Sequence, residues 1–366
     1  MSNALWIAIF VMLISFATSL VANKTIILLT EKMGFGIDHP SKRKVHNKPV
    51  ARLGGVGILL GMLTCLYFLK IDKTLLTLLL GGIFIFIVGL WDDLYALSGK
   101  IKILLLIIST FIVIGFSGLR VESLGNLVGL GEIRLGYLAV PFTVFATVGL
   151  ISAINFIDGL NGLAGGLSLL PAVIMLGLGF HAVSPDMALL DCAFIGALAG
   201  FLIYNFPHGR IFMGDSGSML LGYWLSIFLV FLFGKDNHSY RPMIAVLLLF
   251  VPIFDAIRLT AVRIIKSKSP FTASYVHVHH IFYRSGVSHK NTTLLLYLVA
   301  IIPAYFALVT RVRSGWEHLL FAILYASLLG LLLEFMIKNS RFLAKRMKGI
   351  SRSQNNPKES RLEKNL

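Results

Sequence analysis

Long apolar runs recur along the whole chain and constrain its fold more than any other feature. Each is about 16 to 22 residues long, close to the roughly 20 that a helix needs to cross a hydrocarbon core of about 30 Å. Hydrophobic residues make up 57% of the sequence and charged residues 14%, whereas a soluble domain carries about 25% charged residues. No alternating strand pattern is present, so the sequence predicts an all-α, polytopic membrane bundle.

Eleven such runs predict eleven transmembrane helices. The predicted spans cover residues 4–22, 54–69, 75–91, 103–119, 138–154, 163–180, 187–204, 219–233, 243–262, 292–310 and 318–337. Because consecutive spans cross the membrane in opposite directions, the loops after spans one, three, five, seven and nine share a face with the C-terminal tail. The polar motifs described below lie in or beside these loops.

The distribution of basic residues assigns a side to that face. It carries 25 of the 33 Lys and Arg residues, and the opposite face carries 8. The positive-inside rule makes the richer face cytoplasmic, with the N-terminus outside and the C-terminus in the cytosol. Topology therefore explains the net charge of +16 better than nucleic-acid binding does.

The chain is predicted to form one transmembrane domain, residues 1–340, followed by a basic and disordered cytoplasmic tail, residues 341–366. The N-terminal run lacks a preceding basic flank and a cleavage site, so we interpret it as a retained span. The outer loop 121–137 has the pattern of a short hairpin. Cys65 and Cys192 both lie in apolar runs, which excludes a disulfide framework and a cysteine metal site.

Asp215 is the first candidate site residue. It lies in the polar, Gly- and Pro-containing segment 205–217, just before the eighth span. A carboxylate at the edge of a membrane span is costly unless the protein uses it, which favours a functional role. The structural alternative is that Asp215 caps the N-terminus of the following helix.

Asp92 and Asp93 end the third span on the same predicted face, and Lys100 and Lys102 follow them. Adjacent helical side chains point about 100° apart, so the two carboxylates are not expected to hold one ligand equally. One of them could orient or deprotonate a nucleophile while the other holds structure. The lysines could bind phosphate, although snorkelling at the membrane edge is the simpler explanation for either one alone.

Residues 155–166 combine Asn155, Asp158 and Asn161 with four glycines. Glycine lets the backbone approach a ligand closely, and the helix that follows presents free N–H groups suited to phosphate. Asp158 could hold Mg²⁺, which prefers hard oxygen ligands. Glycines alone would favour a helix-packing interface, but the polar residues beside them favour a site.

His277, His279 and His280 form an H-x-H-H motif in the long polar loop 263–291. No cysteine or acidic residue adjoins them, so zinc is not favoured. The imidazoles could instead contact a diphosphate or a sugar and change charge near neutral pH. Asp255 and Arg258 lie in the preceding span, and we interpret them as a structural i,i+3 ion pair.

Together these motifs resemble the polyprenyl-phosphate N-acetylhexosamine-1-phosphate transferase family of glycosyltransferase family 4. The resemblance runs from about residue 38 to residue 280. It includes Lys44-Val45-His46 with Arg52-Leu53-Gly54-Gly55, Trp91-Asp92-Asp93, residues 155–166, residues 205–217 and His277-Val278-His279-His280. Each motif alone is weak, but five in order on one predicted face are specific. The family's eleven-span topology agrees with the count above.

The resemblance implies a Mg²⁺-dependent enzyme, with Mn²⁺ as an alternative ion, that transfers sugar-1-phosphate from a UDP-N-acetylhexosamine to undecaprenyl phosphate and releases UMP. Such a reaction begins the synthesis of a bacterial surface glycan such as O-antigen or teichoic acid. It implies a site that faces the cytosol from the bacterial cytoplasmic (inner) membrane, with membrane lipid as a partner and no nucleic acid. A homodimer is left open.

The family's roles carry over by position. Asp215 is the leading Mg²⁺ ligand, and Asp158 is the second. Asp92 would position or deprotonate the acceptor phosphate, supported by Asp93. The residues expected to bind substrate are Asn155, Asn161, Asn205, Lys102, His277, His279 and His280. Because the acceptor phosphate is already largely ionised at pH 7, deprotonation is the less favoured role for Asp92.

Two departures from the family pattern leave the donor sugar open. Many members have Asp where this chain has Asn161, and many have Asp-Arg where it has Ser274-Tyr275. The H-x-H-H motif favours an N-acetylglucosamine donor over UDP-MurNAc-pentapeptide, whose phosphotransferase in peptidoglycan synthesis is the alternative. A 6-deoxyhexosamine or UDP-GalNAc also fits. A lipid-linked sugar transporter and an inactive homologue are the alternatives of another class.

Overall fold

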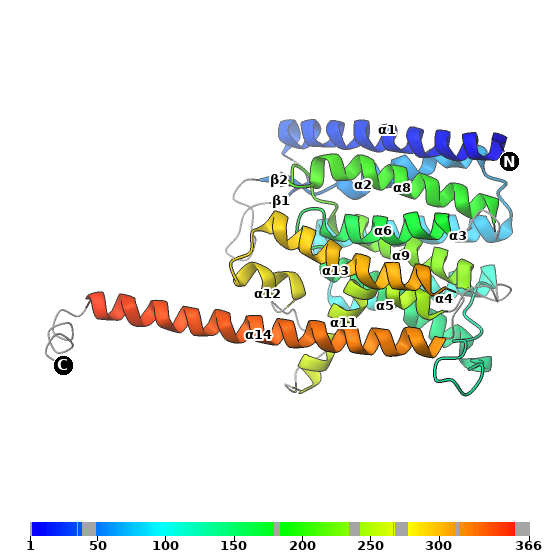
Figure 1. Cartoon of the computed structure of the whole chain (residues 1–366). Helices are drawn as coiled ribbons and strands as arrows, with labels where there is room; N and C mark the ends of the chain where they lie inside the picture. The colour runs from blue at the N-terminus through cyan, green and yellow to red at the C-terminus, as the bar shows by residue number, and fades with distance from the viewer. Residues whose placement is uncertain are drawn as a thin grey trace, which may run out of the picture.

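The computed structural model describes residues 2–34, 36–38, 49–178, 184–233, 242–265, 267, 277–311 and 315–355. Nearly all of its regular structure is helical (Figure 1). The α-helices are α1 (Ser2–Met33), α2 (Gly54–Leu63), α3 (Lys73–Tyr95), α4 (Gly99–Ser117), α5 (Ala139–Ile157), α6 (Leu163–Gly177), α8 (Pro185–Asn205), α9 (Gly214–Phe233), α10 (Met243–Leu248), α11 (Phe250–Ile265), α12 (Val278–Arg284), α13 (His289–Val309) and α14 (Gly315–Asn355). Two 3-10 helices, η1 (Thr64–Phe68) and η2 (Gly136–Leu138), complete the helical set.

Eight of the described helices are long and apolar enough to cross a membrane, namely α1, α3, α4, α5, α8, α9, α13 and α14. The predicted spans 54–69 and 163–180 correspond to shorter apolar helices, α2 with η1 and α6. The all-α membrane fold is therefore confirmed. The count of eleven spans and the orientation of the termini stay predictions.

The predicted span 243–262 is broken into α10 and α11 at Leu249. Pro252 explains the break, because proline lacks an N–H and its ring clashes with the carbonyl of the residue four positions earlier, Leu248. The second part, α11, is amphipathic and carries Asp255 and Arg258 on the way to the histidine motif.

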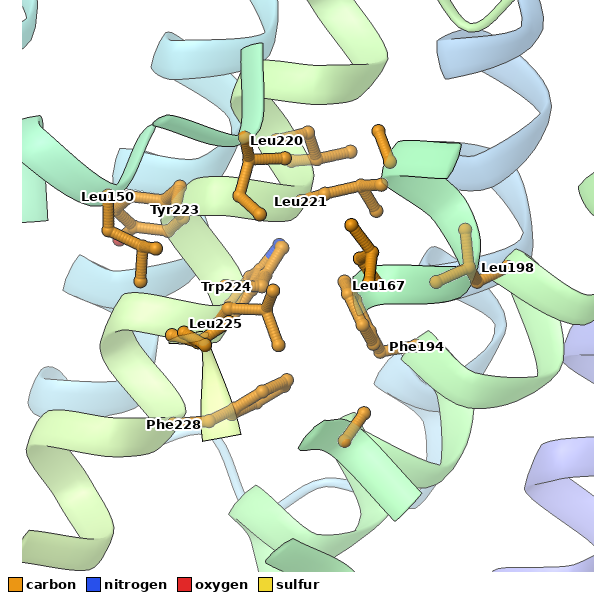
Figure 2. Packing of buried hydrophobic residues seen from close by; sticks show 14 of the residues in the cluster. Leu150, Leu167, Phe194, Leu198, Leu220, Leu221, Tyr223, Trp224, Leu225 and Phe228 are labelled. Carbon is orange, nitrogen blue, oxygen red and sulfur yellow. The ribbon is translucent and has the colours of Figure 1, made fainter. Parts of the chain in front are cut away.

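Helix α9 forms the centre of the bundle. In its most apolar stretch 89% of the residues are buried, compared with 17% in α1 and 11% in α14. Tyr223, Trp224 and Phe228 of α9 pack near Phe194 of α8 and Leu167 of α6 (Figure 2). Because α9 begins at the Asp215 motif, this packing holds the start of the helix in a fixed place within the fold.

A small two-stranded sheet lies at the end of the bundle away from the N-terminus, as does α12 (Figure 1). Strand β1 (Ile37–Asp38) pairs antiparallel with β2 (Val50–Ala51). Ala51 forms a parallel bridge with Ile211. Next to it, the N–H groups of Gly54 and Gly55 donate to the carbonyls of Phe212 and Met213, each at 2.9 Å. This pairing ties the segment that contains Arg52 to the segment that leads into α9.

The predicted short hairpin in residues 121–137 is present, since Ser123 and Arg134 form an antiparallel bridge, while its place on the outer side stays a prediction. Helix α14 continues to Asn355, past the predicted boundary between residues 340 and 341, while residues 356–366 lie outside the described residues. The division into a domain and a tail stays a prediction. Two quoted motifs, Lys44-Val45-His46 and Ser274-Tyr275, also lie outside the described residues.

Candidate active site

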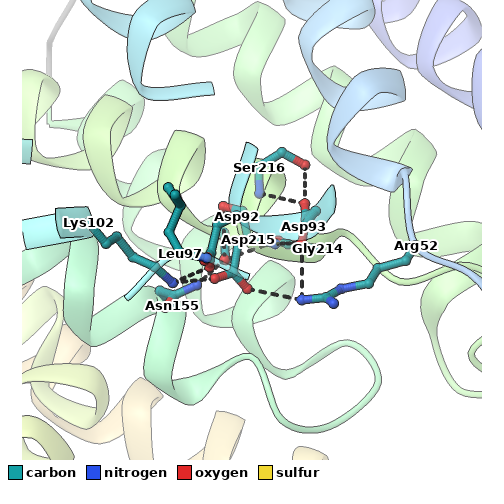
Figure 3. A network of polar contacts seen from close by, with 10 residues as sticks. Arg52, Asp92, Asp93, Leu97, Lys102, Asn155, Gly214, Asp215 and Ser216 are labelled. Atoms are coloured by element: carbon teal, nitrogen blue, oxygen red, sulfur yellow. Dashed lines mark hydrogen bonds and ion pairs between the residues drawn. The ribbon is translucent and has the colours of Figure 1, made fainter. Parts of the chain in front are cut away.

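Asp93 holds the first turn of α9. Its carboxylate accepts hydrogen bonds from the backbone N–H of Asp215 at 2.8 Å, from the N–H of Ser216 at 3.0 Å and from the Ser216 hydroxyl at 2.8 Å (Figure 3). Gly89, one turn earlier on α3, permits this approach, because a Cβ there would collide with the backbone of Ser216. Asp93 therefore supplies the helix cap that we had considered for Asp215, and the Asp215 carboxylate is free to point elsewhere.

The Asp215 carboxylate meets two cations. Lys102 Nζ donates to its Oδ2 at 2.5 Å, and the Arg52 guanidinium lies 3.4 Å from its Oδ1 (Figure 3). Lys102 also pairs with Asp92, and Arg52 pairs with Asp93 at 3.1 Å. Lys102 thus points into the site and does not snorkel away from it. Its side chain, 19% exposed, bridges Asp92 and Asp215.

The two adjacent aspartates have different neighbours, as their angular separation on a helix predicts. Asp92 accepts from Lys102 and from the N–H of Leu97 at 2.7 Å, whereas Asp93 faces α9 and Arg52. Three carboxylates and two cations therefore form one cluster at the start of α9. Fixed positive charges of this kind can hold phosphate groups through charge-assisted hydrogen bonds.

A cavity of about 1100 Å³ opens beside this cluster. Six predicted site residues line it: Asn155, Asp158, Asn161, Asn205, Asp215 and His280. Asp92, Asp93, Lys102, His277 and His279 do not line it. The predicted site therefore contains residues that line the cavity and residues that lie behind this lining.

Other residues on the cavity wall were not singled out from the sequence. They include Lys24 and Glu31 at the end of α1, His208 and Arg210 before α9, and His289 at the start of α13. Arg52 also lines the cavity and belonged to a quoted motif, but we had assigned it no role. Nothing in the spacing of these residues relates them to the site, because they come from four separate segments.

Asp158 lies in the turn between α5 and α6. Among the residues that the structure describes, none forms a hydrogen bond or an ion pair with its carboxylate. Enclosure by the cavity wall raises the pKa of Asp158 to about 8, and the negative charges of Asp215 and Asp93 act in the same direction. A cation bound in the cavity would favour the ionised form of this carboxylate.

The described residues contain no preformed cluster of three His, Cys, Asp or Glu side chains able to hold a metal. Mg²⁺ does not require one, because it is commonly held by one or two carboxylates together with substrate phosphates and water. Asp158 and Asp215, which line the same cavity, fit that pattern. The unpartnered Asp158 carboxylate is the observation that favours a cation there.

The three predicted asparagines are engaged within the protein. Asn205 accepts from the N–H of Gly162 at 2.6 Å and donates to the carbonyl of Ile211 at 2.8 Å. Asn161 donates to the carbonyl of Pro207 at 3.1 Å. These two amides hold the 158–162 turn against the segment that precedes α9. Asn155 donates to the Ser218 hydroxyl at 2.9 Å, which links α5 to α9.

The histidine motif forms the start of a short helix, α12, and is not wholly loop. His277 is 8% exposed and His279 is 1% exposed, whereas His280 reaches the cavity. Burial lowers the pKa of His279 to about 3 and also lowers the pKa of His280, with neighbouring histidines adding to the effect. His279 is therefore neutral at pH 7 and does not change charge near neutrality, whereas a change of charge elsewhere in the motif stays a prediction.

The predicted ion pair between Asp255 and Arg258 is present at 3.2 Å. Its interpretation as a purely local pair was incomplete, because Asp255 also contacts His277 across 22 residues of sequence. An acidic partner for the histidines therefore exists, although none adjoins them in the sequence.

Gly159 is a point where a single methyl group should disturb the site. A Cβ at this position would collide with Nε2 of the buried His279 ring. We therefore expect Gly159→Ala to displace the histidine motif and lower turnover. The control is Gly149→Ala on α5, where a Cβ meets nothing within 4 Å. Steady-state turnover of both variants would check this. Equal turnover in the two variants would contradict the close contact between Gly159 and His279.

Comparison with known proteins provides independent information. The family model described as glycosyl transferase family 4 matches residues 75–233. The chain is 34% identical to a probable undecaprenyl-phosphate N-acetylglucosaminyl 1-phosphate transferase of Bacillus subtilis (strain 168), over 84% of this chain and 86% of that protein.

Two further similar proteins are named undecaprenyl-phosphate alpha-N-acetylglucosaminyl 1-phosphate transferase. The one from Yersinia pestis is 28% identical over 96% of this chain and 97% of that protein. The one from Escherichia coli (strain K12) is 29% identical over 87% of this chain and 89% of that protein. These similarities extend over nearly the whole length of the chain, and the matched family segment contains Asp92, Asp158 and Asp215.

Proposed function

Because the chain belongs to glycosyl transferase family 4, we propose that it transfers an N-acetylhexosamine 1-phosphate from a UDP-sugar to undecaprenyl phosphate and releases UMP. The names of its relatives favour N-acetylglucosamine as the sugar. The reaction would begin the assembly of a bacterial surface glycan, at a site that faces the cytosol from the cytoplasmic membrane.

The observation that carries this proposal is the charged cluster beside the cavity. A volume of about 1100 Å³ accommodates a nucleotide sugar, since pockets for small ligands typically measure about 300–1,000 Å³. Arg52 and Lys102 bring two cations to the Asp215 carboxylate at this cavity. Two phosphate-bearing reactants repel each other, and the three carboxylates of the cluster outnumber its two cations. Their approach therefore requires a bound cation in addition to Arg52 and Lys102.

In the proposed reaction a phosphate oxygen of undecaprenyl phosphate attacks the β-phosphorus of the donor. The bond between that phosphorus and the bridging oxygen breaks, and the oxygen leaves on the α-phosphate as UMP. The acceptor phosphate is largely ionised at pH 7, so it does not need a strong general base. Asp92 is therefore assigned to holding Lys102, which it contacts directly, beside the reacting phosphates.

Asp215 and Asp158 are the residues proposed to hold Mg²⁺, with Mn²⁺ as a substitute. The ion would neutralise the charge of the donor diphosphate and polarise its phosphoryl oxygens. Asp93 orients Asp215 through the first turn of α9. Arg52 spans Asp93 and Asp215, so it limits the movement of that turn while adding positive charge.

The experiment that tests the proposal measures UMP release by purified protein with undecaprenyl phosphate and Mg²⁺ across a panel of UDP-N-acetylhexosamines. The panel includes UDP-GlcNAc, UDP-GalNAc, a 6-deoxy donor and UDP-MurNAc-pentapeptide. We expect UDP-GlcNAc to give the highest rate. If a folded protein released no UMP with any donor, the result would contradict the proposed reaction and favour the inactive homologue. Sugar movement across vesicles without UMP release would favour a transporter.

Asn161→Asp is expected to stay active. The substitution removes one amide hydrogen bond to the Pro207 carbonyl, worth about 1 kcal/mol, and many family members carry Asp there. The matched control is Asn205→Asp, which removes a donor from a side chain that is 5% exposed and bonded at both ends. Turnover of the two variants checks this. Complete loss in a folded Asn161→Asp protein would mean that the amide is specifically required.

A further inference from the structure

Asp255 is the buried carboxylate of α11 that the reaction described above does not use. It is 2% exposed and lies in the helix that follows the break at Leu249. Sequence spacing pairs it with Arg258, one turn further on. A buried carboxylate with only one partner on its own helix would be poorly compensated, so its other contacts decide what it does.

Both oxygens of Asp255 reach across to α12. Oδ2 lies 2.8 Å from Nδ1 of His277, and Oδ1 accepts the backbone N–H of Val278 at 2.9 Å. Arg258 donates to the same Oδ1 at 3.2 Å. His277 and Val278 are the N-cap and first residue of α12, so this carboxylate anchors the helix at its start.

The anchored residues are packed against the rest of the site. The centroid of the His277 ring lies 5.5 Å from that of His279, with an interplanar angle of 16°. It lies 6.1 Å from the ring centroid of Phe156 of α5. The His279 ring in turn lies 4.3 Å from the His280 ring and fills the space beside Gly159. Displacement of His277 would therefore be transmitted through contacting rings to His280 at the cavity.

We propose that Asp255 is a positioning residue for the transfer reaction, holding the start of α12 so that His280 faces the donor cavity. This inference rests on the proposed function. Because a carboxylate only accepts hydrogen bonds when ionised, the contact also assigns the proton of His277 to Nδ1. Asp255 itself does not line the cavity, so it acts through α12 and not by contact with substrate.

The test is a double-mutant cycle between Asp255→Ala and His280→Ala, read as kcat for UMP release. Asp255→Ala is expected to lower kcat by about 10–100-fold, by analogy with the loss seen when a partner that orients a metal-bound histidine is removed. In the His280→Ala background the same change should have little further effect, because the residue it positions is absent. Independent, multiplicative losses would overturn the proposal.

Two variants distinguish positioning from general loss of structure. Asp255→Asn keeps an oxygen that can accept from Val278, and its amide N–H can donate to Nδ1 of His277 once the ring proton moves to Nε2. We therefore expect Asp255→Asn to retain most of the kcat that Asp255→Ala loses. Asp191→Ala is the matched control, since Asp191 is a fully buried aspartate on α8 with no hydrogen-bond partner among the described residues. It should leave kcat unchanged. An Asp255→Asn protein as slow as Asp255→Ala would contradict the proposed anchoring.

A readout without turnover keeps this inference separate from the proposed function. Carbethoxylation of His280 by diethyl pyrocarbonate, followed by peptide mass spectrometry, reports how that ring is presented to solvent. We expect its rate to differ between the wild-type and Asp255→Ala proteins and to be the same in Asp191→Ala. Equal rates in all three would overturn the positioning role, even in a protein that proved active. If the wild-type protein released no UMP, the result would instead contradict the proposed function.

Discussion

Asp215→Asn is expected to reduce UMP release to background, a loss of about 10³-fold or more, while the protein stays folded. The change is nearly isosteric but removes the negative charge that meets Arg52 and Lys102. It also removes one of the two carboxylates proposed to hold Mg²⁺ in the cavity. The backbone N–H of Asp215, which Asp93 caps, is unaffected, so α9 should still begin at the same residue.

The measurement is turnover at saturating Mg²⁺, together with size-exclusion behaviour in detergent and the thermal unfolding midpoint. Asp186→Asn is a matched control, because Asp186 also lies in the first turn of a helix, α8, but does not line the cavity. It should remain active. Substantial residual turnover in Asp215→Asn would reject Asp215 as an essential residue of the site.

Asp93→Ala should differ from Asp215→Asn, because its primary effect should be a large loss of stability. The substitution deletes three hydrogen bonds to the first turn of α9 and a partner of Arg52. The Asp93 side chain is 2% exposed, so water cannot readily replace these bonds. We expect a loss of about 2–4 kcal/mol in the free energy of unfolding, from the lost cap and charged hydrogen bonds together.

Reversible unfolding in mixed micelles would measure this loss, and turnover at low temperature would show how much activity survives in the folded fraction. Activity should also fall, because the first turn of α9 carries Asp215. Asp93→Asn keeps one acceptor and should fall between the wild type and Asp93→Ala in stability. If Asp93→Ala were as stable as the wild type, the capping role that the geometry assigns to Asp93 would be wrong.

Much of the candidate site could be predicted from sequence because membrane topology is a strong constraint. A chain of spanning helices must place alternate loops on the same face, so the segments around Asp92, Asp158 and Asp215 could be grouped without knowing any contact. Of these, Asp158 and Asp215 line one cavity, and Asp92 contacts Lys102 behind it. The helical fold followed from hydropathy alone.

The division of roles within the site could not be predicted in the same way. Hydropathy shows that Asp92 and Asp93 end a span, but only the close approach of α3 to α9 shows that Asp93 is a cap. The amides of Asn161 and Asn205 resembled ligand contacts, yet both have partners within the protein. Spacing rules relate residues on one helix, and these bonds join different segments.

The histidine motif illustrates the same limit over a longer distance. Asp255 and His277 lie 22 residues apart in the sequence and on different helices, so no helical or strand periodicity connects them. Burial of His279 and His280 also depends on packing against Gly159 and the neighbouring rings, which a sequence pattern does not specify. The prediction that an imidazole of the motif changes charge near neutral pH is wrong for His279 for this reason.

If this cavity transfers a sugar together with its phosphate, the β-phosphorus of the donor must move to the lipid. UDP-GlcNAc labelled with ³²P at the β-position would be incubated with the protein, Mg²⁺ and undecaprenyl phosphate, and the products separated into lipid and water-soluble fractions. We expect the label to enter the lipid fraction while unlabelled UMP appears in water. Label retained in water as UDP, with sugar transferred to lipid, would contradict this transfer.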